Sequence, residues 1–162
     1  MNIKHATLLS LAALGLAAGS AHAQVTNTMP LQITIQNACN VNTVAPTTLD
    51  FGTQGPLIAN VDQSATITVT CTTGANYNVA LDGGGGANVG ARRMINGGNT
   101  VAYQLYRDAG RTLVWGTTIG TDTLAGTGNG LPQALPVYGR VPAQATPPAA
   151  VYNDNITVTV SY

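Results

Sequence analysis

Two alternating segments lie near the two ends of this chain. Residues 25–35 have the sequence Val-Thr-Asn-Thr-Met-Pro-Leu-Gln-Ile-Thr-Ile, and residues 156–162 end the chain with Ile-Thr-Val-Thr-Val-Ser-Tyr. Side chains of a strand point alternately to its two faces, so this spacing predicts strands with one apolar and one polar face. A long strand at one end and a strand that stops with the chain favour a β-sandwich that shares strands between molecules. That indicates assembly rather than catalysis.

Residues 1–23 have the pattern of a secretory signal peptide. Lys4 and His5 provide a basic start, residues 8–18 are apolar, and Ala21-His22-Ala23 fits the small residues of a cleavage site. The apolar stretch is shorter than the roughly 20 residues that a membrane-spanning helix needs. We therefore expect export and a mature chain that starts at Gln24 and forms one domain.

The charge of the mature chain is close to zero. Five arginines face six aspartates, there is no glutamate, and both histidines belong to the predicted signal peptide. Without a basic cluster the chain lacks the field that holds nucleic acid, so we expect no nucleic-acid partner. Ser-His-Asp triads and the common zinc sites also need residues that the mature chain lacks.

Aspartates are the remaining candidates for acid–base chemistry. They occur at predicted turns and strand ends, where Asp is favoured because it hydrogen-bonds the nearby backbone. We therefore expect no catalytic residue, metal or cofactor, and no enzyme activity. A hydrolase that uses aspartates is a weaker alternative, which a single Asp→Asn change would test.

The mature chain has two cysteines, Cys39 and Cys71. In an exported chain an even number of cysteines favours a disulfide, because the periplasm is oxidising. A metal or redox pair is the alternative, but there is no Cys-x-x-Cys spacing and no histidine ligand. Alternation through residues 65–72 places Cys71 on the apolar face together with Ile67 and Val69. We predict a structural disulfide that pins a sheet.

The middle of the chain predicts short strands separated by turns. The turn Asn96-Gly97-Gly98-Asn99 indicates a hairpin. Aromatic Trp115, Tyr103 and Tyr106 could form a sugar-stacking platform, but a place in the core or over the hairpins is favoured. The pair Arg92-Arg93 favours a solvated turn. Further strands are expected at residues 48–52, 77–81, 101–106, 111–115, 135–141 and 152–162. About seven short strands predict an immunoglobulin-like sandwich.

Several of these segments together carry a family resemblance. The chain resembles the spore coat protein U domain family and, within it, the pilin subunits of archaic (Csu-type) chaperone–usher pili. The resemblance covers essentially the whole mature chain. It rests on the N-terminal alternating segment and on Leu49-Asp50-Phe51-Gly52, Ile67-Thr68-Val69-Thr70-Cys71, Leu81-Asp82-Gly83-Gly84, residues 103–108 (Tyr-Gln-Leu-Tyr-Arg-Asp), Leu135-Pro136-Val137-Tyr138-Gly139 and residues 152–162.

The resemblance implies an all-β, immunoglobulin-like sandwich that lacks its final strand and is completed by donor-strand complementation. Residues 24–36 would be the donor-strand extension and residues 37–162 the incomplete pilin domain. Asn27 and Pro30 depart from a regular donor pattern. The donor would insert Val25, Met29, Leu31, Ile33 and Ile35 into an acceptor groove, whose edge strand would carry Ile156, Val158, Val160 and Tyr162.

The same resemblance implies the partners and the location. A periplasmic chaperone would lend a strand to each subunit, and an outer-membrane usher would exchange it for the extension of a sister or identical subunit. We expect a structural subunit of a surface pilus, a fimbrium that supports adhesion and biofilm formation. A self-contained secreted β-domain, spore-coat-like or carbohydrate-binding, is the alternative.

Overall fold

The computed structural model describes residues 25–41 and 48–162. The predicted signal peptide, residues 1–23, and Gln24 lie outside the described residues. The chain divides into two units, residues 1–34 and residues 35–162, each considered by itself. In the first unit, the described residues 25–34 form neither helix nor strand, and their side chains are exposed.

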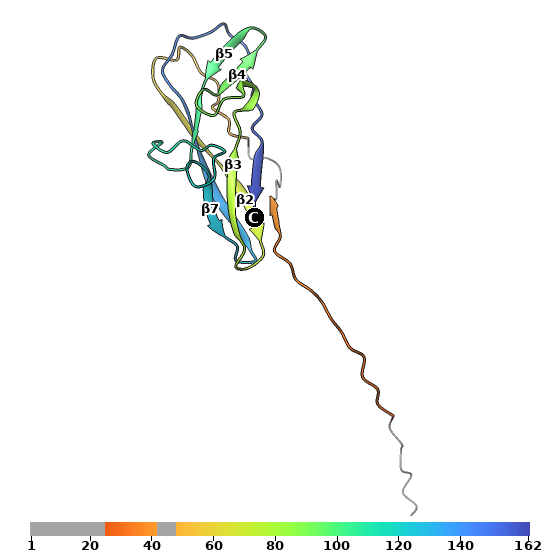
Figure 1. Cartoon of the computed structure of the whole chain (residues 1–162). Coiled ribbons are helices and arrows are strands. Elements are labelled where there is room, and N and C mark those ends of the chain that lie inside the picture. Colours follow the sequence, from red (N-terminus) through yellow and green to blue (C-terminus); the bar gives the residue numbers. More distant parts are fainter. Residues whose placement is uncertain (1–24, 42–47) are drawn as a thin grey trace, which may run out of the picture. The chain divides into compact units, whose positions relative to one another are not determined.

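The second unit consists of antiparallel strands in two main sheets (Figure 1). The first sheet has the order β1-β2-β8-β6, with β1 (Cys39–Val41), β2 (Val61–Cys71), β8 (Pro132–Val141) and β6 (Gln104–Tyr106). The second has the order β7-β3-β9, with β7 (Leu124–Thr127), β3 (Asn76–Leu81) and β9 (Val158–Ser161). Strands β4 (Arg93–Asn96) and β5 (Asn99–Ala102) form a separate hairpin, and a short 3-10 helix covers Gly84–Gly86.

Apolar side chains of both main sheets meet in one core. Its members include Val69 and Cys71 from β2, Val79 and Leu81 from β3, and Val137 and Val141 from β8. Trp115 has no exposed surface and donates its indole N–H to the carbonyl oxygen of Val79 at 2.8 Å. The sequence-based placement of this aromatic in the core is therefore confirmed, and the Trp115 side chain ties a loop to the second sheet.

Several strand predictions are confirmed. Strand β3 covers the predicted strand 77–81, and β4 and β5 are joined through Gly97-Gly98, with Asn96 opposite Asn99. Gly97 has a φ of 57°, the left-handed conformation that a two-residue hairpin turn requires.

Other expectations are wrong in detail. Residues 48–52 form no strand, although Phe51 is buried in the core. The terminal strand is also shorter than predicted. It covers only residues 158–161, and an isolated bridge between Asn153 and Ile95 precedes it. Alternation places Phe51 and the terminal side chains on the correct face, but it does not decide whether a neighbouring backbone is present to form a ladder.

Candidate functional site

A groove of about 1340 Å³ lies within the second unit and is lined by both main sheets. Its apolar lining includes Ile67, Leu105 and Val137 from the first sheet and Leu81 and Val158 from the second. Ile67 and Val158 are only partly buried although they pack against the core, so the apolar interior reaches solvent here. The volume exceeds the roughly 300–1,000 Å³ of a typical small-molecule pocket. A polypeptide segment fits this space better than a small ligand.

The terminal segment borders the groove with its apolar face. Ile156, Val158 and Val160 are partly buried against the core, whereas Thr157, Thr159 and Ser161 between them are exposed. Ile156 and Val158 line the groove directly. Tyr162 follows the end of β9 and is exposed.

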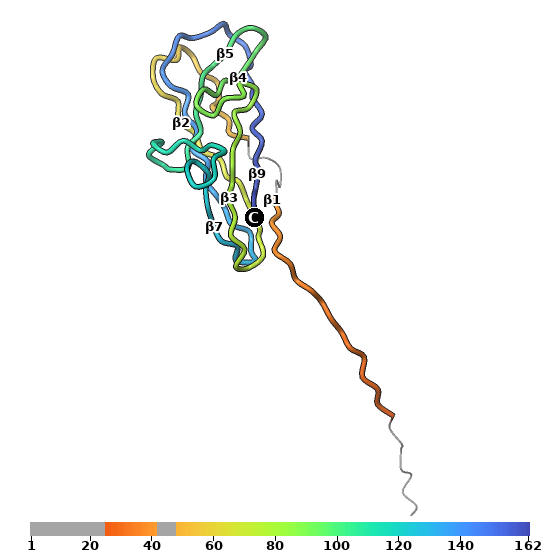
Figure 2. Tube along the Cα trace, in the orientation of Figure 1, coloured from red at the N-terminus to blue at the C-terminus, as the bar shows by residue number. Residues whose placement is uncertain are grey.

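Strand β9 is paired along one side only. It pairs with β3 from Asn78 opposite Ser161 to Leu81 opposite Val158. Among the described residues, no strand pairs with the other side of β9. Figure 2 shows β1, the edge strand of the first sheet, beside β9. The second sheet therefore ends at β9 in an edge that can accept a further strand.

Hydrogen bonds of Thr157 show how this edge is oriented. The Thr157 N–H donates to Asp82 Oδ1 at 2.9 Å, and its carbonyl oxygen accepts from the Asp82 N–H at 3.2 Å. Backbone groups of successive residues in an antiparallel strand point to opposite sides. The N–H and C=O groups of Ile156, Val158 and Val160 are therefore directed toward the side without a paired strand.

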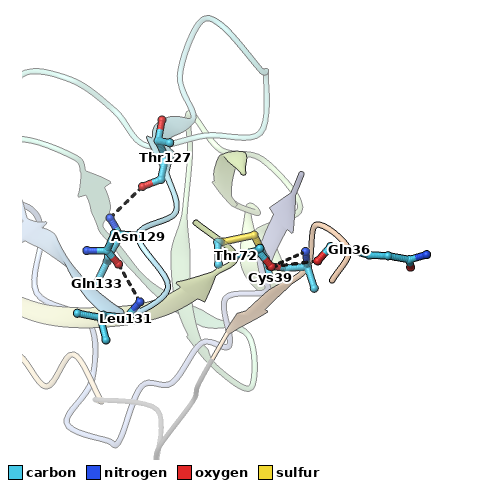
Figure 3. The surroundings of a disulfide bond; sticks show 9 residues. Gln36, Cys39, Thr72, Thr127, Asn129, Leu131 and Gln133 are labelled. Carbon is cyan, nitrogen blue, oxygen red and sulfur yellow. Dashed lines mark hydrogen bonds between the residues drawn. A yellow bond between two sulfur atoms is a disulfide. The ribbon is translucent and has the colours of Figure 1, made fainter. Parts of the chain in front are cut away.

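The predicted disulfide is present in the structure. Cys39 and Cys71 lie directly opposite each other in β1 and β2, and their sulfur atoms are 2.08 Å apart. Next to it, the Thr72 N–H donates to Ala38 O at 2.9 Å and the Thr72 hydroxyl donates to Gln36 O at 3.2 Å (Figure 3). These bonds fix the backbone immediately after the alternating N-terminal segment.

The predicted donor side chains are all exposed. Val25, Met29, Leu31, Ile33 and Ile35 are between 70 and 94% exposed. Five large apolar side chains at alternating positions are costly to leave in water, because each gains about 1.5–3 kcal/mol when it is buried. The segment therefore has an unsatisfied apolar face that is suited to a partner.

The sequence predicts a solvated turn at Arg92-Arg93, and for Arg92 this prediction is wrong. Its side chain is 1% exposed, and its guanidinium donates to the carbonyl oxygens of Leu81, Asp82 and Trp115 and to Gln104 Oε1 at 2.6–2.8 Å. Burial lowers the pKa of Arg92, and nearby Tyr103 and aspartates counteract this shift. Arg93 is exposed, as expected. No signal within a dipeptide distinguishes these two arginines, because the carbonyl oxygens come from distant segments.

Two aspartates hold the terminal segment at one end of the groove. Asp154 Oδ1 accepts from the Gly85 N–H at 2.8 Å, and Oδ2 accepts from the Tyr103 hydroxyl at 2.7 Å. Asp82 Oδ1 accepts from the Gly84 N–H at 3.0 Å as well as from Thr157. Burial tends to raise the pKa of Asp82, but these hydrogen bonds and the Arg92 charge lower it overall. Burial and the Asp154 hydrogen bond raise the pKa of Tyr103.

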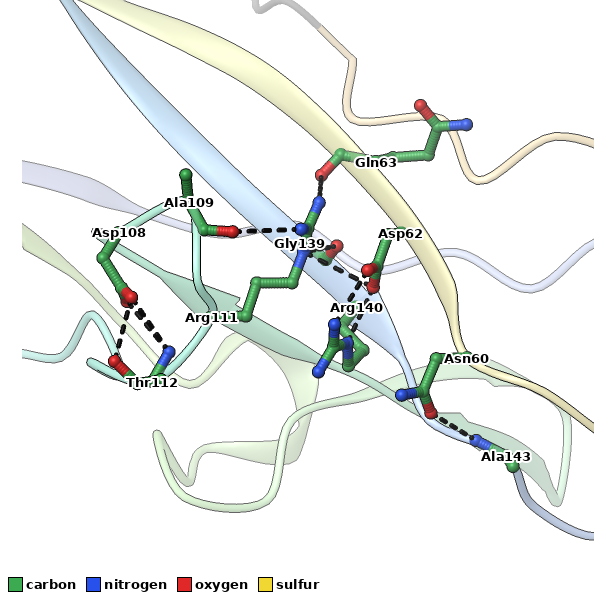
Figure 4. Close-up of polar contacts among 10 residues, drawn as sticks. All are labelled: Asn60, Asp62, Gln63, Asp108, Ala109, Arg111, Thr112, Gly139, Arg140 and Ala143. Carbon is green, nitrogen blue, oxygen red and sulfur yellow. Dashed lines mark hydrogen bonds and ion pairs between the residues drawn. The ribbon is translucent and has the colours of Figure 1, made fainter.

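The outer face of the first sheet carries an ion-pair cluster (Figure 4). Asp62 on β2 accepts from Arg140 on β8 at 2.7 and 2.8 Å and lies 3.4 Å from Arg111. The Arg140 hydrogen bond lowers the pKa of Asp62, and Asp62 raises that of Arg140. The Arg111 guanidinium also lies 5.8 Å from the centre of the Tyr138 ring. These exposed contacts join neighbouring strands and do not face the groove.

Clustered metal ligands and membrane-spanning helices are two further features that could carry a function. Within residues 25–41 and 48–162, no three His, Cys, Asp or Glu residues are grouped so that they could hold a metal ion. No helix in the same ranges combines the length and the apolar character needed to cross a bilayer.

The chain is similar to known proteins in sequence and in fold. Protein U of Myxococcus xanthus is 35% identical over an alignment of 143 positions, and the match covers 79% of this chain and 79% of that protein. A solved chain from the CsuC–CsuE chaperone–tip adhesion subunit pre-assembly complex of the archaic chaperone–usher Csu pili of Acinetobacter baumannii has a TM-score of 0.58 at 15% identity. The match covers 80% of this chain and 41% of that one.

The structural neighbour gives information about the fold, and the family match shows to which family the chain belongs. This chain spans less than half of the neighbour, and at 15% identity the likeness shows the fold alone. Together with the observed sheets it confirms the all-β, immunoglobulin-like prediction. The Spore Coat Protein U domain model matches residues 25–159, which is most of the sequence. The chain belongs to the spore coat protein U domain family.

Proposed function

We propose that this chain is a structural subunit of a chaperone–usher surface pilus that polymerises by donor-strand exchange. The observation that carries the proposal is the groove of about 1340 Å³ beside the unpaired edge of β9. The occupant is the alternating segment 25–35 of another subunit, whose apolar side chains are exposed in the single chain. Backbone pairing to β9 and apolar anchoring in the groove together constitute β-strand addition.

The energetics support a long-lived contact. Five apolar anchors contribute about 1.5–3 kcal/mol each on burial, and each new backbone hydrogen bond adds roughly 0.5–1.5 kcal/mol. The costs of association and of ordering the segment reduce this total by several kcal/mol. Enough remains for a subunit contact that dissociates very slowly.

The proposal includes partners and a location. A periplasmic chaperone protects the groove before assembly, an outer-membrane usher directs exchange, and the fibre at the cell surface supports adhesion and biofilm formation. The similar Csu chain comes from a chaperone–subunit pre-assembly complex of an archaic pilus, which supports this assignment by analogy of fold. No enzymatic step is part of this function.

Denaturing electrophoresis of the unheated protein, purified from cells that export it, tests the proposal. Strand-swapped polymer gives a ladder of multimers that collapses to monomer on heating. Leu31→Asp and Ile33→Asp place charges on the apolar face of the segment, so each should abolish the ladder. Gln32→Asp and Thr34→Asp are matched controls on the opposite face and should keep it. A monomer band in the parent chain, with cooperative unfolding of that monomer, would refute the proposal.

The family description favours a second candidate, a secreted coat protein that does not exchange strands. Deletion of residues 24–36 separates the two functions. A pilin without this segment should still reach the periplasm bound to its chaperone but fail to polymerise. A coat protein should still be incorporated at the cell surface by contacts of its folded domain.

A further inference from the structure

We propose that Asp82 and Asp154 are positioning residues that hold the terminal segment in register for strand uptake, an inference that rests on the proposed function. The two carboxylates and the backbone groups that they bind are called the carboxylate clasp below. The observation behind it is that Asp154, Asn155 and Ile156 line the groove, although residues 154–157 belong to no strand.

The terminal segment has no continuous β-ladder at residues 154–157. Its ladder with β3 begins at Val158, opposite Leu81, and the preceding backbone bridge is at Asn153, opposite Ile95. Between these points, the Asp82 N–H donates to the Thr157 carbonyl oxygen at 3.2 Å, and the two carboxylates supply the remaining contacts of the backbone N–H groups. Asp82 binds the Thr157 N–H, and Asp154 binds the N–H of Asn155 at 2.8 Å.

Both carboxylates also bind the loop formed by the four glycines at residues 83–86. Asp82 accepts from Gly84, and Asp154 accepts from Gly85. The loop approaches so closely that a Cβ on Gly84 would lie within van der Waals radii of the Asp154 carboxylate, and Gly84 has a φ of 59°. Gly84 is therefore a position of close backbone approach, where a side chain would not fit.

Tyr103 connects the clasp to the core. Its ring is buried and lies beside Phe51, and its hydroxyl donates to Asp154 Oδ2 at 2.7 Å. The buried Arg92 guanidinium donates to the Asp82 carbonyl oxygen at 2.8 Å. The clasp is thus attached to two buried side chains, which fixes the position of the terminal backbone relative to the groove wall.

The clasp sets the register of the terminal segment at the β9 edge. Strand addition needs the backbone groups of Ile156, Val158 and Val160 in a straight row, and a slip by one residue would turn their side chains out of the groove. By binding Thr157 to Asp82, and Asp154 to Gly85 and Tyr103, the clasp keeps this row aligned before an incoming strand arrives. Preorganisation of this kind lowers the ordering cost of binding.

Uptake of a synthetic peptide of residues 24–36 by the mature chain tests the inference. The association rate of fluorescently labelled peptide is measured for the parent, Asp82→Asn, Asp154→Asn and Tyr103→Phe. We expect at least a tenfold lower rate for each Asp variant, because a charge-assisted hydrogen bond is lost, and a smaller decrease for Tyr103→Phe. Amide exchange at Thr157 should become faster in Asp82→Asn.

Asp108→Asn is the matched control. Asp108 also binds backbone N–H groups, those of Thr112 and Leu113, but it lies in a loop that does not line the groove. Its peptide association rate should stay within about twofold of the parent. Trp115 fluorescence and the unfolding midpoint show that each variant retains its core. If Asp154→Asn does not fold, Tyr103→Phe decides, since it removes a single hydroxyl.

The outcomes separate this inference from the proposed function. If the parent takes up the peptide and the folded clasp variants do so at the rate of Asp108→Asn, the clasp inference is overturned and strand exchange stands. If the parent itself takes up no peptide while its groove is free, strand exchange fails and the clasp loses its role with it.

Discussion

The two edge strands beside the groove are held in different ways. Strand β1 is joined to β2 by the Cys39–Cys71 disulfide and by backbone pairing. Strand β9 is held by its pairing with β3 and by the carboxylates of Asp82 and Asp154. The disulfide links β1 covalently to its sheet, whereas β9 has no covalent link to its own sheet. Among the described residues, each of these two strands has one side without a paired strand. Under the proposed function, β9 is the edge that the donor strand joins.

Removal of the disulfide that holds β1 should have the largest effect on the stability of the chain. In the double variant Cys39→Ser/Cys71→Ser, we expect the free energy of unfolding to fall by roughly 3.5–4 kcal/mol, because the bond closes a loop over a separation of 32 residues. Urea unfolding of the variant and of the reduced parent measures the loss. A change below about 1 kcal/mol would show that β1 is held mainly by its non-covalent contacts.

Loss of the buried Arg92 side chain should have the second-largest effect on stability. Arg92→Leu leaves the carbonyl oxygens of Leu81, Asp82 and Trp115 without their donor, so the chain should be destabilised by about 3 kcal/mol. Arg93→Leu is the control, because that side chain is exposed, and it should change stability by less than about 0.5 kcal/mol. Equal effects of the two variants in urea unfolding would contradict the assigned role of Arg92.

Acid should weaken the carboxylate-held edge. The pKa of Asp82 is lower in the folded chain than the ordinary value of 3.8. Its stabilising contribution is therefore complete above that value and is lost as the pH falls through the folded pKa. Asp82→Asn should cost about 1 kcal/mol at pH 7, and the difference from the parent should disappear at low pH. Unfolding midpoints between pH 2 and 7 measure this, and a difference that does not depend on pH would refute it.

Loss of the exposed ion pair between Arg140 and Asp62 should have the smallest effect on stability. Arg140→Gln breaks a bond to Asp62 on the outer face of the first sheet, and such exposed pairs contribute about 0–1 kcal/mol. We expect a small loss of stability at low salt that vanishes at high salt, because ions screen the pair. A loss that persists in concentrated salt would indicate that packing of the Arg140 stem matters more than its charge.

Much of the fold follows from local patterns in the sequence. Alternation along residues 65–71 places Ile67, Val69 and Cys71 inward, and the two glycines after Asn96 give the β4–β5 hairpin. The pairing of Cys39 with Cys71 follows from export and from an even number of cysteines. These features are predictable because each depends on side-chain period, turn geometry or redox compartment, all of which act over a few residues or on the whole chain.

The candidate site was only partly predictable. Alternation indicates that Ile156, Val158 and Val160 share an apolar face, but it does not show that residues 154–157 lack a ladder or that Asp154 binds Gly85. The burial of Arg92 was missed for the same reason. Its acceptors belong to residues 81, 82, 104 and 115, and only the packed chain brings them together.

The sequence alone therefore determined the strand faces, the disulfide and two apolar alternating segments, residues 25–35 and 156–162. Only the tertiary structure decided that β9 is an edge of the second sheet among the described residues, that a groove lies beside it, and that two aspartates and a buried arginine support it. The physical reason is that side-chain period specifies which face of a strand is apolar. The partner of each backbone edge depends on where distant segments meet, and the amino-acid pattern of one strand carries no information about that.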